Sequence, residues 1–375
     1  MSMYRPSLKS GWSLILLFLF AVGLYVLAQS SYVHIKTDNY EEKVQAARLM
    51  QTYMDSLKAE LKATGYEFDP IDDPFHTGLI GTRLSSITTD RGLLSDKQAA
   101  LNPNLAAIFV EEFKKERLSE GDHIAVGISG SNPAVNLALY AAISVLKLNP
   151  AVITAVSSAS YGANREDYTW LDIEAVLKKK RLIDFSSSYA SLGGKDDLAI
   201  GLSDNGLASL RDAMTRNGVP LLLGSTLEEN VSLREAAYKE LLPEGQRYRM
   251  FVNIGGGLAN VGSEPNSRLI PEGINHKLAE KEFEKQGIMM VMARQNVPVL
   301  HVRRIQRWAR KYEVASTQEK IPTPGEGPAF SSRKHNVTIA SICLALLVAA
   351  IVVVIVFDRH DRRFMANIVD PDEEL

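Results

Sequence analysis

Two serines between an expected strand and an expected helix have the spacing of a reactive or ligand-binding turn. The segment Gly127-Ile128-Ser129-Gly130-Ser131 is close to the nucleophile elbow of hydrolases, with Ser131 in place of that pattern's second glycine. It contains neither the lysine of a phosphate-binding loop nor the glycine fingerprint of dinucleotide-binding proteins. A nucleophilic serine, an anion-binding turn and a plain tight connection all remain open.

A serine nucleophile needs a general base, and the sequence offers few candidates. They are His76, His123, His276 and His301, with Asp172 or Asp196 as the carboxylate that orients the ring. His123 begins the strand that Ser129 ends, so the two lie roughly 20 Å apart along an extended chain. None of these histidines follows a strand within a loop. We therefore expect ligand binding in preference to catalysis.

The elements around the two serines explain how such a turn would work. An apolar strand, His123 to Ser129, leads into the turn, and a mostly apolar helix from Ala134 to about Leu148 follows. Ser131 or Asn132 can cap this helix through a side-chain oxygen, and Pro133 suits its first position. Such an elbow directs backbone N–H groups and the positive end of a helix dipole toward an anion.

Strands alternate with helices through most of the chain, which predicts an α/β fold with a doubly wound, mostly parallel sheet. Further strands are expected at residues 79–81, 151–156, 187–192, 219–223, 250–254, 288–293 and 297–302. Further helices are expected at residues 40–64, 102–117, 206–217, 227–241 and 275–286, and after Thr169, with Asp172 completing a capping box. Because ligands of such sheets bind at the carboxyl ends of the strands, the Ser-, Thr-, Gly- and Asn-rich loops that follow the strands are the expected binding face.

Two apolar runs divide the chain into domains. Residues 12–28 form a retained transmembrane helix or, alternatively, a signal peptide, and residues 337–357 form a second span. Arg5 and Lys9 precede the first run, and basic residues follow the second, which indicates cytoplasmic ends. The expected order is a cytoplasmic N-terminus (1–11), span, extracytoplasmic α/β domain beginning with an amphipathic helix (29–320), Pro/Gly linker (321–336), span and cytoplasmic tail (358–375).

Composition narrows the function classes. The chain has 375 residues, 46% of them hydrophobic, and a formal net charge of −2, which gives no indication of nucleic-acid binding. Its single cysteine, Cys343, lies in the second apolar run, so neither a disulfide framework nor a cysteine metal site is expected. No His, Asp and Glu cluster has metal-ligand spacing, and no cofactor is expected.

A basic segment follows the last expected strand. Arg303, Arg307 and Arg310 have helical spacing, and Arg304 and Lys311 add to the charge. One hypothesis is that this segment meets anionic lipid or polymer, with Trp308 at a membrane surface. An ordinary exposed helix is the simpler interpretation.

The order of the motifs resembles the poly-γ-glutamate system protein family. The motifs are 79–81 with 87–89, Asn102-Pro103, Ser129-Gly130-Ser131, Tyr161-Gly162-Ala163-Asn164, Thr169-Trp170-Leu171-Asp172, Gly193-Gly194 and Val252-Asn253-Ile254-Gly255-Gly256-Gly257. The likeness covers roughly residues 78–328, and together the motifs are specific although each alone is weak. The sequence departs from the family between the last strand and the linker, where the basic segment replaces a loop ending in Gly-Leu-Pro.

The resemblance implies an accessory subunit of poly-γ-glutamate synthesis or export in the bacterial cytoplasmic membrane, in contact with synthase or export subunits and with the anionic polymer. The alternative is a serine-dependent γ-glutamyl hydrolase or transferase with Ser129, Ser131 and Asp172 as candidate catalytic residues. Carboxylates would be bound by backbone N–H groups of the Gly/Ser turns, assisted by Lys97, Lys195 and Arg234, although each of these cations alone is ordinarily a solvated surface charge. The expected ligand-binding residues are Thr88, Thr89, Ser129, Gly130, Ser131, Ser160, Asn164, Gly193, Gly194, Gly255, Gly256 and Gly257.

Overall fold

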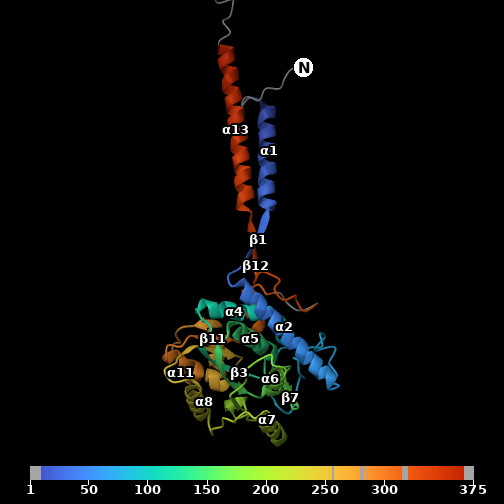
Figure 1. Cartoon of the computed structure of the whole chain (residues 1–375), viewed down its shortest axis with the longest axis vertical. Coiled ribbons are helices and arrows are strands. Elements are labelled where there is room, and N and C mark those ends of the chain that lie inside the picture. Colours follow the sequence, from blue (N-terminus) through green and yellow to red (C-terminus); the bar gives the residue numbers. More distant parts are fainter. Residues whose placement is uncertain (1–9, 256, 279–282, 284, 315–319, 367–375) are drawn as a thin grey trace, which may run out of the picture. The chain divides into compact units, whose positions relative to one another are not determined.

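The computed structural model describes residues 10–255, 257–278, 283, 285–314 and 320–366, with side chains up to residue 360. The chain forms two compact units, one from its two ends and one from Thr37–Phe330 (Figure 1). The expected Gly256 and the residues Arg5, Lys9, Arg362 and Arg363 lie outside the residues or side chains described.

The unit formed by the chain ends is a pair of apolar helices on a short ribbon. Helix α1 (Gly11–Ser30) lies beside α13 (Val337–Ala366), as Figure 1 shows. Strands β1 (Tyr32–Lys36) and β12 (Ser331–His335) pair antiparallel, with the Arg333 guanidinium 3.8 Å from the centre of the Tyr32 ring. Gly11–Ser30 and Val337–His360 are each long and apolar enough to cross a membrane, as the sequence predicts.

The larger unit is built on a six-stranded sheet in the order β10-β11-β9-β3-β4-β8. All neighbours in it are parallel except β10 and β11. The strands are β3 (His123–Ser129), β4 (Asn149–Ala155), β8 (Tyr189–Ser191), β9 (Tyr248–Ile254), β10 (Gly273–Asn275) and β11 (Val299–Val302). From β3 the chain moves outward through β4 and β8, then returns to β9 on the other side of β3. The order therefore reverses between β3 and β9, which is where ligands of such sheets bind.

Helices cover both faces of the sheet, so the mostly parallel α/β sheet expected from the sequence is present. Along β3, Ile124, Val126 and Ile128 point into one apolar core and Ala125 into the other. The first core is formed with α2 (Tyr40–Ala63), α4 (Leu105–Lys115), α5 (Pro133–Leu146), α6 (Trp170–Lys179) and α12 (Ile305–Lys311). The second is formed with α8 (Leu227–Leu241), α9 (Leu258–Val261) and α11 (Ile288–Arg294). Strands buried on both faces account for the near-continuous apolar runs in the sequence.

Shorter elements complete this unit. They are β2 (Thr88–Asp90), α3 (Leu94–Ala99), β5 (Ser158–Ala159), β6 (Asn164–Arg165), β7 (Tyr168–Thr169), the 3-10 turn η1 (Lys195–Asp197), α7 (Asp204–Arg216) and α10 (Glu264–Leu269). Strand β2 pairs with β5, and β6 with β7. The capping box expected at Thr169 and Asp172 is present at the start of α6.

Four of the helices and strands expected from the sequence differ from those in the structure. Residues 79–81 form no strand. The Gly81 N–H donates to the Tyr161 carbonyl oxygen, and the next N–H, of Thr82, donates to the Asn164 side chain instead of to a neighbouring strand. Residues 219–223 make only one parallel bridge, Leu221 to Ala190, since Pro220 has no N–H to extend the pairing.

The other two differences lie before β11. Residues 288–293 form α11, because a short apolar run fits a buried helix as well as a buried strand. The helix expected at 275–286 is also wrong where the structure describes it. Asn275 ends β10 and pairs with Val299, and residues 276–278 are not helical.

Candidate functional site

The turn between β3 and α5 has the elbow shape expected, but its side chains do different work. Pro133 occupies the first turn of α5, and Asn132 is the N-cap residue but makes no cap hydrogen bond through its side chain. The Asn132 Oδ1 instead accepts a hydrogen bond from Lys97 Nζ at 2.7 Å, and the Ser131 Oγ accepts one from the Ala159 N–H at 3.0 Å. The side chains therefore join this turn to α3 and β5.

The backbone donors expected to receive an anion are partly used within the sheet. The Gly130 N–H donates to the Ala155 carbonyl at 3.0 Å, and the Gly255 N–H donates to the Val302 carbonyl at 2.8 Å. The Ser131 N–H points to Ser129 Oγ at 3.3 Å. The sequence predicted that backbone N–H groups of these turns bind an anion. The N–H groups of Gly130 and Gly255 are already hydrogen-bonded within the sheet, so they are not available to a ligand.

A cavity of about 800 Å³ lies where β3 and β9 end. Ser131 and Asn132 line it after β3, Gly255 after β9 and Arg303 after β11. Its other charged lining residues are Asp90, Arg91, Asp96, Lys97, Glu264, Arg304, Arg307 and Arg310. The cations outnumber the carboxylates two to one. The cavity sits at the point where the strand order reverses, and it favours anionic ligands.

Lys97 is a buried cation of this cavity. It is 7% exposed, and its Nζ donates to the Ser131 carbonyl oxygen as well as to Asn132 Oδ1. Burial lowers the pKa of Lys97 to about 8, and the nearby Asp96 and Asp90 limit the decrease. The surface position considered from the sequence is wrong for this residue.

Helix α12 supplies the other cations. Ile305, Trp308 and Ala309 are buried beneath it, which turns Arg304, Arg307 and Arg310 toward solvent. Within the described part of the chain, no carboxylate pairs with the side chains of Arg303, Arg304, Arg307 or Arg310. Trp308 is 2% exposed and packs on Phe109, with ring centres 4.9 Å apart, so it is not the membrane-surface residue that one hypothesis proposed.

The serines do not meet a general base. Neither Ser129 nor Ser131 hydrogen-bonds a described histidine, carboxylate or lysine amine through its hydroxyl. Of the candidate bases, His123 stands at the opposite end of β3, and His276 Nε2 lies 3.3 Å from Glu116. The pieces of a Ser-His-Asp arrangement are therefore not assembled around the elbow.

His301 lies closer to the β3–α5 turn, since it pairs with Asn253, which pairs with Gly127 of β3. Its imidazole is neutral and has structural partners. His301 lies in β11 opposite Asn253, whose amide lies 3.0 Å from Nδ1 and is placed to donate to it. The Nε2 lies 3.2 Å from the Ser267 carbonyl oxygen, which identifies it as the protonated nitrogen. Burial lowers the pKa of His301 to about 4, and the Arg303 charge acts in the same direction.

A buried polar chain that includes His301 supports the strand ends. Arg234 pairs with Asp197 at 3.0 Å and also donates to Asn260, whose amide donates to Asn253. Arg234 is 1% exposed, so it is not the ligand-binding or surface cation considered from the sequence. One feature of the sequence is related to this buried chain. Gly127 interrupts the apolar strand β3, and because it lacks a Cβ it leaves room for the Asn260 side chain.

Other expected residues hold the loops to one another. The Thr89 hydroxyl donates to Ser157 Oγ, Ser160 contacts the Asp90 carbonyl, and the Asn164 amide donates to Thr88 Oγ1. Gly193 and Gly194 have φ of 80° and 68° beside this cluster, and Lys195 is exposed.

The remaining candidates also have structural partners. Asp172 accepts hydrogen bonds from Thr169, Arg216 and Asn217 and does not line the cavity. Gly257 precedes α9. Among the residues expected to bind a ligand or to assist, the structure thus brings Ser131, Gly255 and Lys97 to the cavity, with Ser129 next to Gly255.

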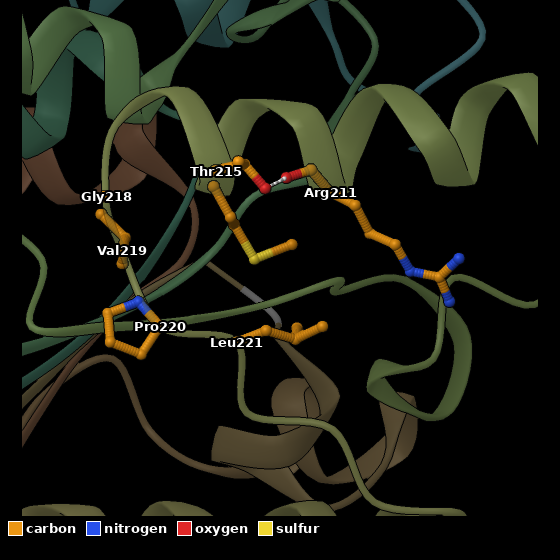
Figure 2. Close-up of a pocket in the computed structure, with 7 residues that line it drawn as sticks. Arg211, Thr215, Gly218, Val219, Pro220 and Leu221 are labelled. Atoms are coloured by element: carbon orange, nitrogen blue, oxygen red, sulfur yellow. Dashed lines mark hydrogen bonds between the residues drawn. The ribbon is translucent and has the colours of Figure 1, made fainter.

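A separate cavity of about 410 Å³ lies between α7 and residues 218–221 (Figure 2). Among the described residues, Arg211 is the one charged residue that lines this cavity, and the cavity shares none of them with the cavity at the ends of β3 and β9. The described residues contain no group of three or more His, Cys, Asp or Glu side chains able to hold a metal ion.

A comparison of the chain with models of protein families, with curated proteins and with solved structures found no match to any of them.

Proposed function

We propose that this protein is a membrane-anchored accessory subunit of poly-γ-glutamate synthesis or export, and that it binds the anionic polymer through the cavity at the ends of β3 and β9. The observation that carries the proposal is the lining of that cavity, where Lys97 and four arginines of residues 303–310 meet three carboxylates. The choice of polymer rests on the resemblance of the sequence motifs.

Side-chain cations, rather than the glycine N–H groups, bind the carboxylates in this proposal. Arginine presents a planar fork of donors that matches a carboxylate, and Arg303, Arg304 and Arg307 stand beside one another after β11. Lys97 adds a positive charge to the cavity beside Ser131. A polymer with one carboxylate per residue would engage several of these cations at once.

The proposed location is the bacterial cytoplasmic membrane, with the α/β domain outside and both chain ends in the cytoplasm. Two apolar helices and the antiparallel pairing of β1 with β12 support an arrangement in which the chain leaves the membrane and returns to it. Synthase or export subunits in the same membrane would be the partners, because an accessory subunit must receive polymer from them.

The proposal is tested by binding of poly-γ-glutamate to the full-length protein in lipid nanodiscs. We expect the double variant Arg303→Gln/Arg307→Gln to bind about a hundredfold more weakly at low salt, because two charge-assisted hydrogen bonds are lost. Arg211→Gln is the matched control, since Arg211 lines the separate cavity of Figure 2, and it should bind as the wild type does. Equal affinity of all three proteins would contradict the proposal.

The alternative, a serine-dependent γ-glutamyl hydrolase or transferase, is separated by Ser129→Ala. A binding subunit should keep wild-type affinity in this variant, because the cations remain. A nucleophile would show covalent labelling of Ser129 by a serine-directed probe and loss of γ-glutamyl turnover in the variant. That pair of results would replace the binding proposal with the enzyme.

A further inference from the structure

Another cavity, called the second cavity below, adjoins the cavity at the ends of β3 and β9 along α12. It has a volume of about 460 Å³ and shares Ser267, Arg303, Arg304 and Arg307 with the larger cavity. Trp308 and Lys311 line only the second cavity, and Arg310 lines only the larger cavity. The two cavities are therefore contiguous, with three arginines at their boundary.

Two buried donors of the second cavity have no hydrogen-bond partner in the described part of the structure. They are the Ser267 hydroxyl and the Trp308 indole Nε1–H. Ser267 is 4% exposed and Trp308 2% exposed. A buried polar group without a partner is destabilising, so an acceptor brought to these two side chains by a ligand of the cavity would remove that cost.

The charges of the second cavity favour an acceptor that is anionic. Arg268 is paired with Glu264, and the Glu272 carboxylate accepts the Arg304 backbone N–H at 3.0 Å. Arg303, Arg307 and Lys311 have no carboxylate partner among the described residues, and they add positive charge to the second cavity. A ligand carboxylate can accept from a hydroxyl, an indole N–H and a guanidinium together.

We infer that the second cavity is a distinct carboxylate subsite, so that the ligand is an extended polycarboxylate that crosses the boundary arginines and occupies both cavities. This inference rests on the proposed function and adds a second place on the protein at which the bound chain is held. A nucleic acid is the other common polyanion. It is disfavoured because Trp308, the one aromatic residue among the described residues that line either cavity, is buried and has no open face for base stacking.

The test compares a γ-glutamyl dipeptide with a γ-linked oligomer of about ten residues, each titrated into the full-length protein in nanodiscs. Wild type should bind the oligomer at least about tenfold more tightly than the dipeptide. Trp308→Phe removes the indole donor and keeps an aromatic ring, and it should lower oligomer affinity about tenfold while leaving dipeptide affinity unchanged. Lys311→Gln should act in the same way, whereas its matched control Arg310→Gln should weaken both ligands.

The outcomes separate the two levels of the proposal. Wild type that binds the dipeptide but gains nothing from chain length overturns the second subsite and leaves the proposed function standing. Wild type that binds neither ligand overturns the proposed function. If Trp308→Phe lowers the melting temperature, Ser267→Ala and Lys311→Gln replace it, and unchanged oligomer affinity in both would overturn the subsite. Tighter binding of a single-stranded oligonucleotide of equal charge would overturn the polycarboxylate assignment.

Discussion

Lys97 is a cavity cation whose charge changes within a few pH units of neutrality. The arginines around it stay charged throughout that range, so a pH effect on anion binding can be traced to one side chain. Burial lowers the pKa of Lys97 to about 8, and Asp90 and Asp96 are the carboxylates near it. The pH dependence of binding therefore tests whether the anion lies next to Lys97 at the β3–α5 turn.

We predict that affinity for poly-γ-glutamate falls about tenfold between about pH 7 and about pH 9, because the folded protein loses the Lys97 proton in this window. The unfolded chain keeps that proton up to about pH 10.5, so the free energy of unfolding should rise over about pH 8 to 10.5. Lys97→Met should bind more weakly at pH 7 and show a flat profile. Titration calorimetry checks the first expectation; parallel profiles for the two proteins would exclude Lys97 from the site.

Residue types and spacing located the turn and singled out Lys97 and the basic segment 303–311 as cations, but did not show which of these cations share one cavity. Pro133 and the two serines could be interpreted from local sequence, because turns and helix starts depend on neighbouring residues. Lys97 reaches Ser131 from 34 residues away, and Arg234 reaches Asp197 from 37. Contacts of this kind depend on the tertiary fold and have no local pattern.

At the scale of the elements, the start of α6 is held by one carboxylate. Burial alone would raise the pKa of Asp172, but hydrogen bonds from Arg216, Asn217 and Thr169 lower it below its usual value. Asp172 thus satisfies the first turn of α6 and joins it to the end of α7. This arrangement favours a structural role over the catalytic role considered from the sequence.

Asp172→Ala should lower the free energy of unfolding by about 2 kcal/mol at pH 7, because a cap and a partly buried ion pair are lost together. The difference from wild type should shrink as pH falls through the lowered pKa of Asp172, where the wild-type carboxylate becomes protonated. Asp167→Ala, which breaks an exposed pair with Arg165, is the control and should cost about 0.5 kcal/mol or less. Denaturant unfolding of the detergent-solubilised protein measures all three. A stable Asp172→Ala that has lost polymer binding would restore a functional role.

The long, strongly patterned elements could be predicted, as could the short strands β8 and β11, whereas other short segments were assigned wrongly. Helices α2 and α8 and strands β3 and β9 follow clear periodicity or β-rich runs. Residues 288–293 were assigned wrongly because six apolar residues fit either structure, and residues 219–223 because the effect of Pro220 on pairing depends on its neighbour. The basic segment followed an expected strand, so its place at the binding edge was available from the parallel-sheet pattern.

At the scale of the whole molecule, the orientation of the chain determines whether the cavity can meet exported polymer. The proposed topology places Thr37–Phe330 outside, between two spans. Cys343 is the single cysteine, so a Cys343→Ser background allows one new thiol to report the side of the membrane at a chosen position. Lys195 and Arg359 are both exposed within their own units, which makes them a matched pair of sites.

We predict that Lys195→Cys reacts with a membrane-impermeant maleimide in intact spheroplasts, because its loop belongs to the proposed outer domain. Arg359→Cys should react only after the membrane is permeabilised, because it follows the second span and the positive-inside rule retains such residues in the cytoplasm. Equal labelling of both sites after permeabilisation controls for thiol reactivity. Protection of Lys195→Cys together with labelling of Arg359→Cys would invert the topology. The cavity would then face the cytoplasm, where it could meet polymer only before export.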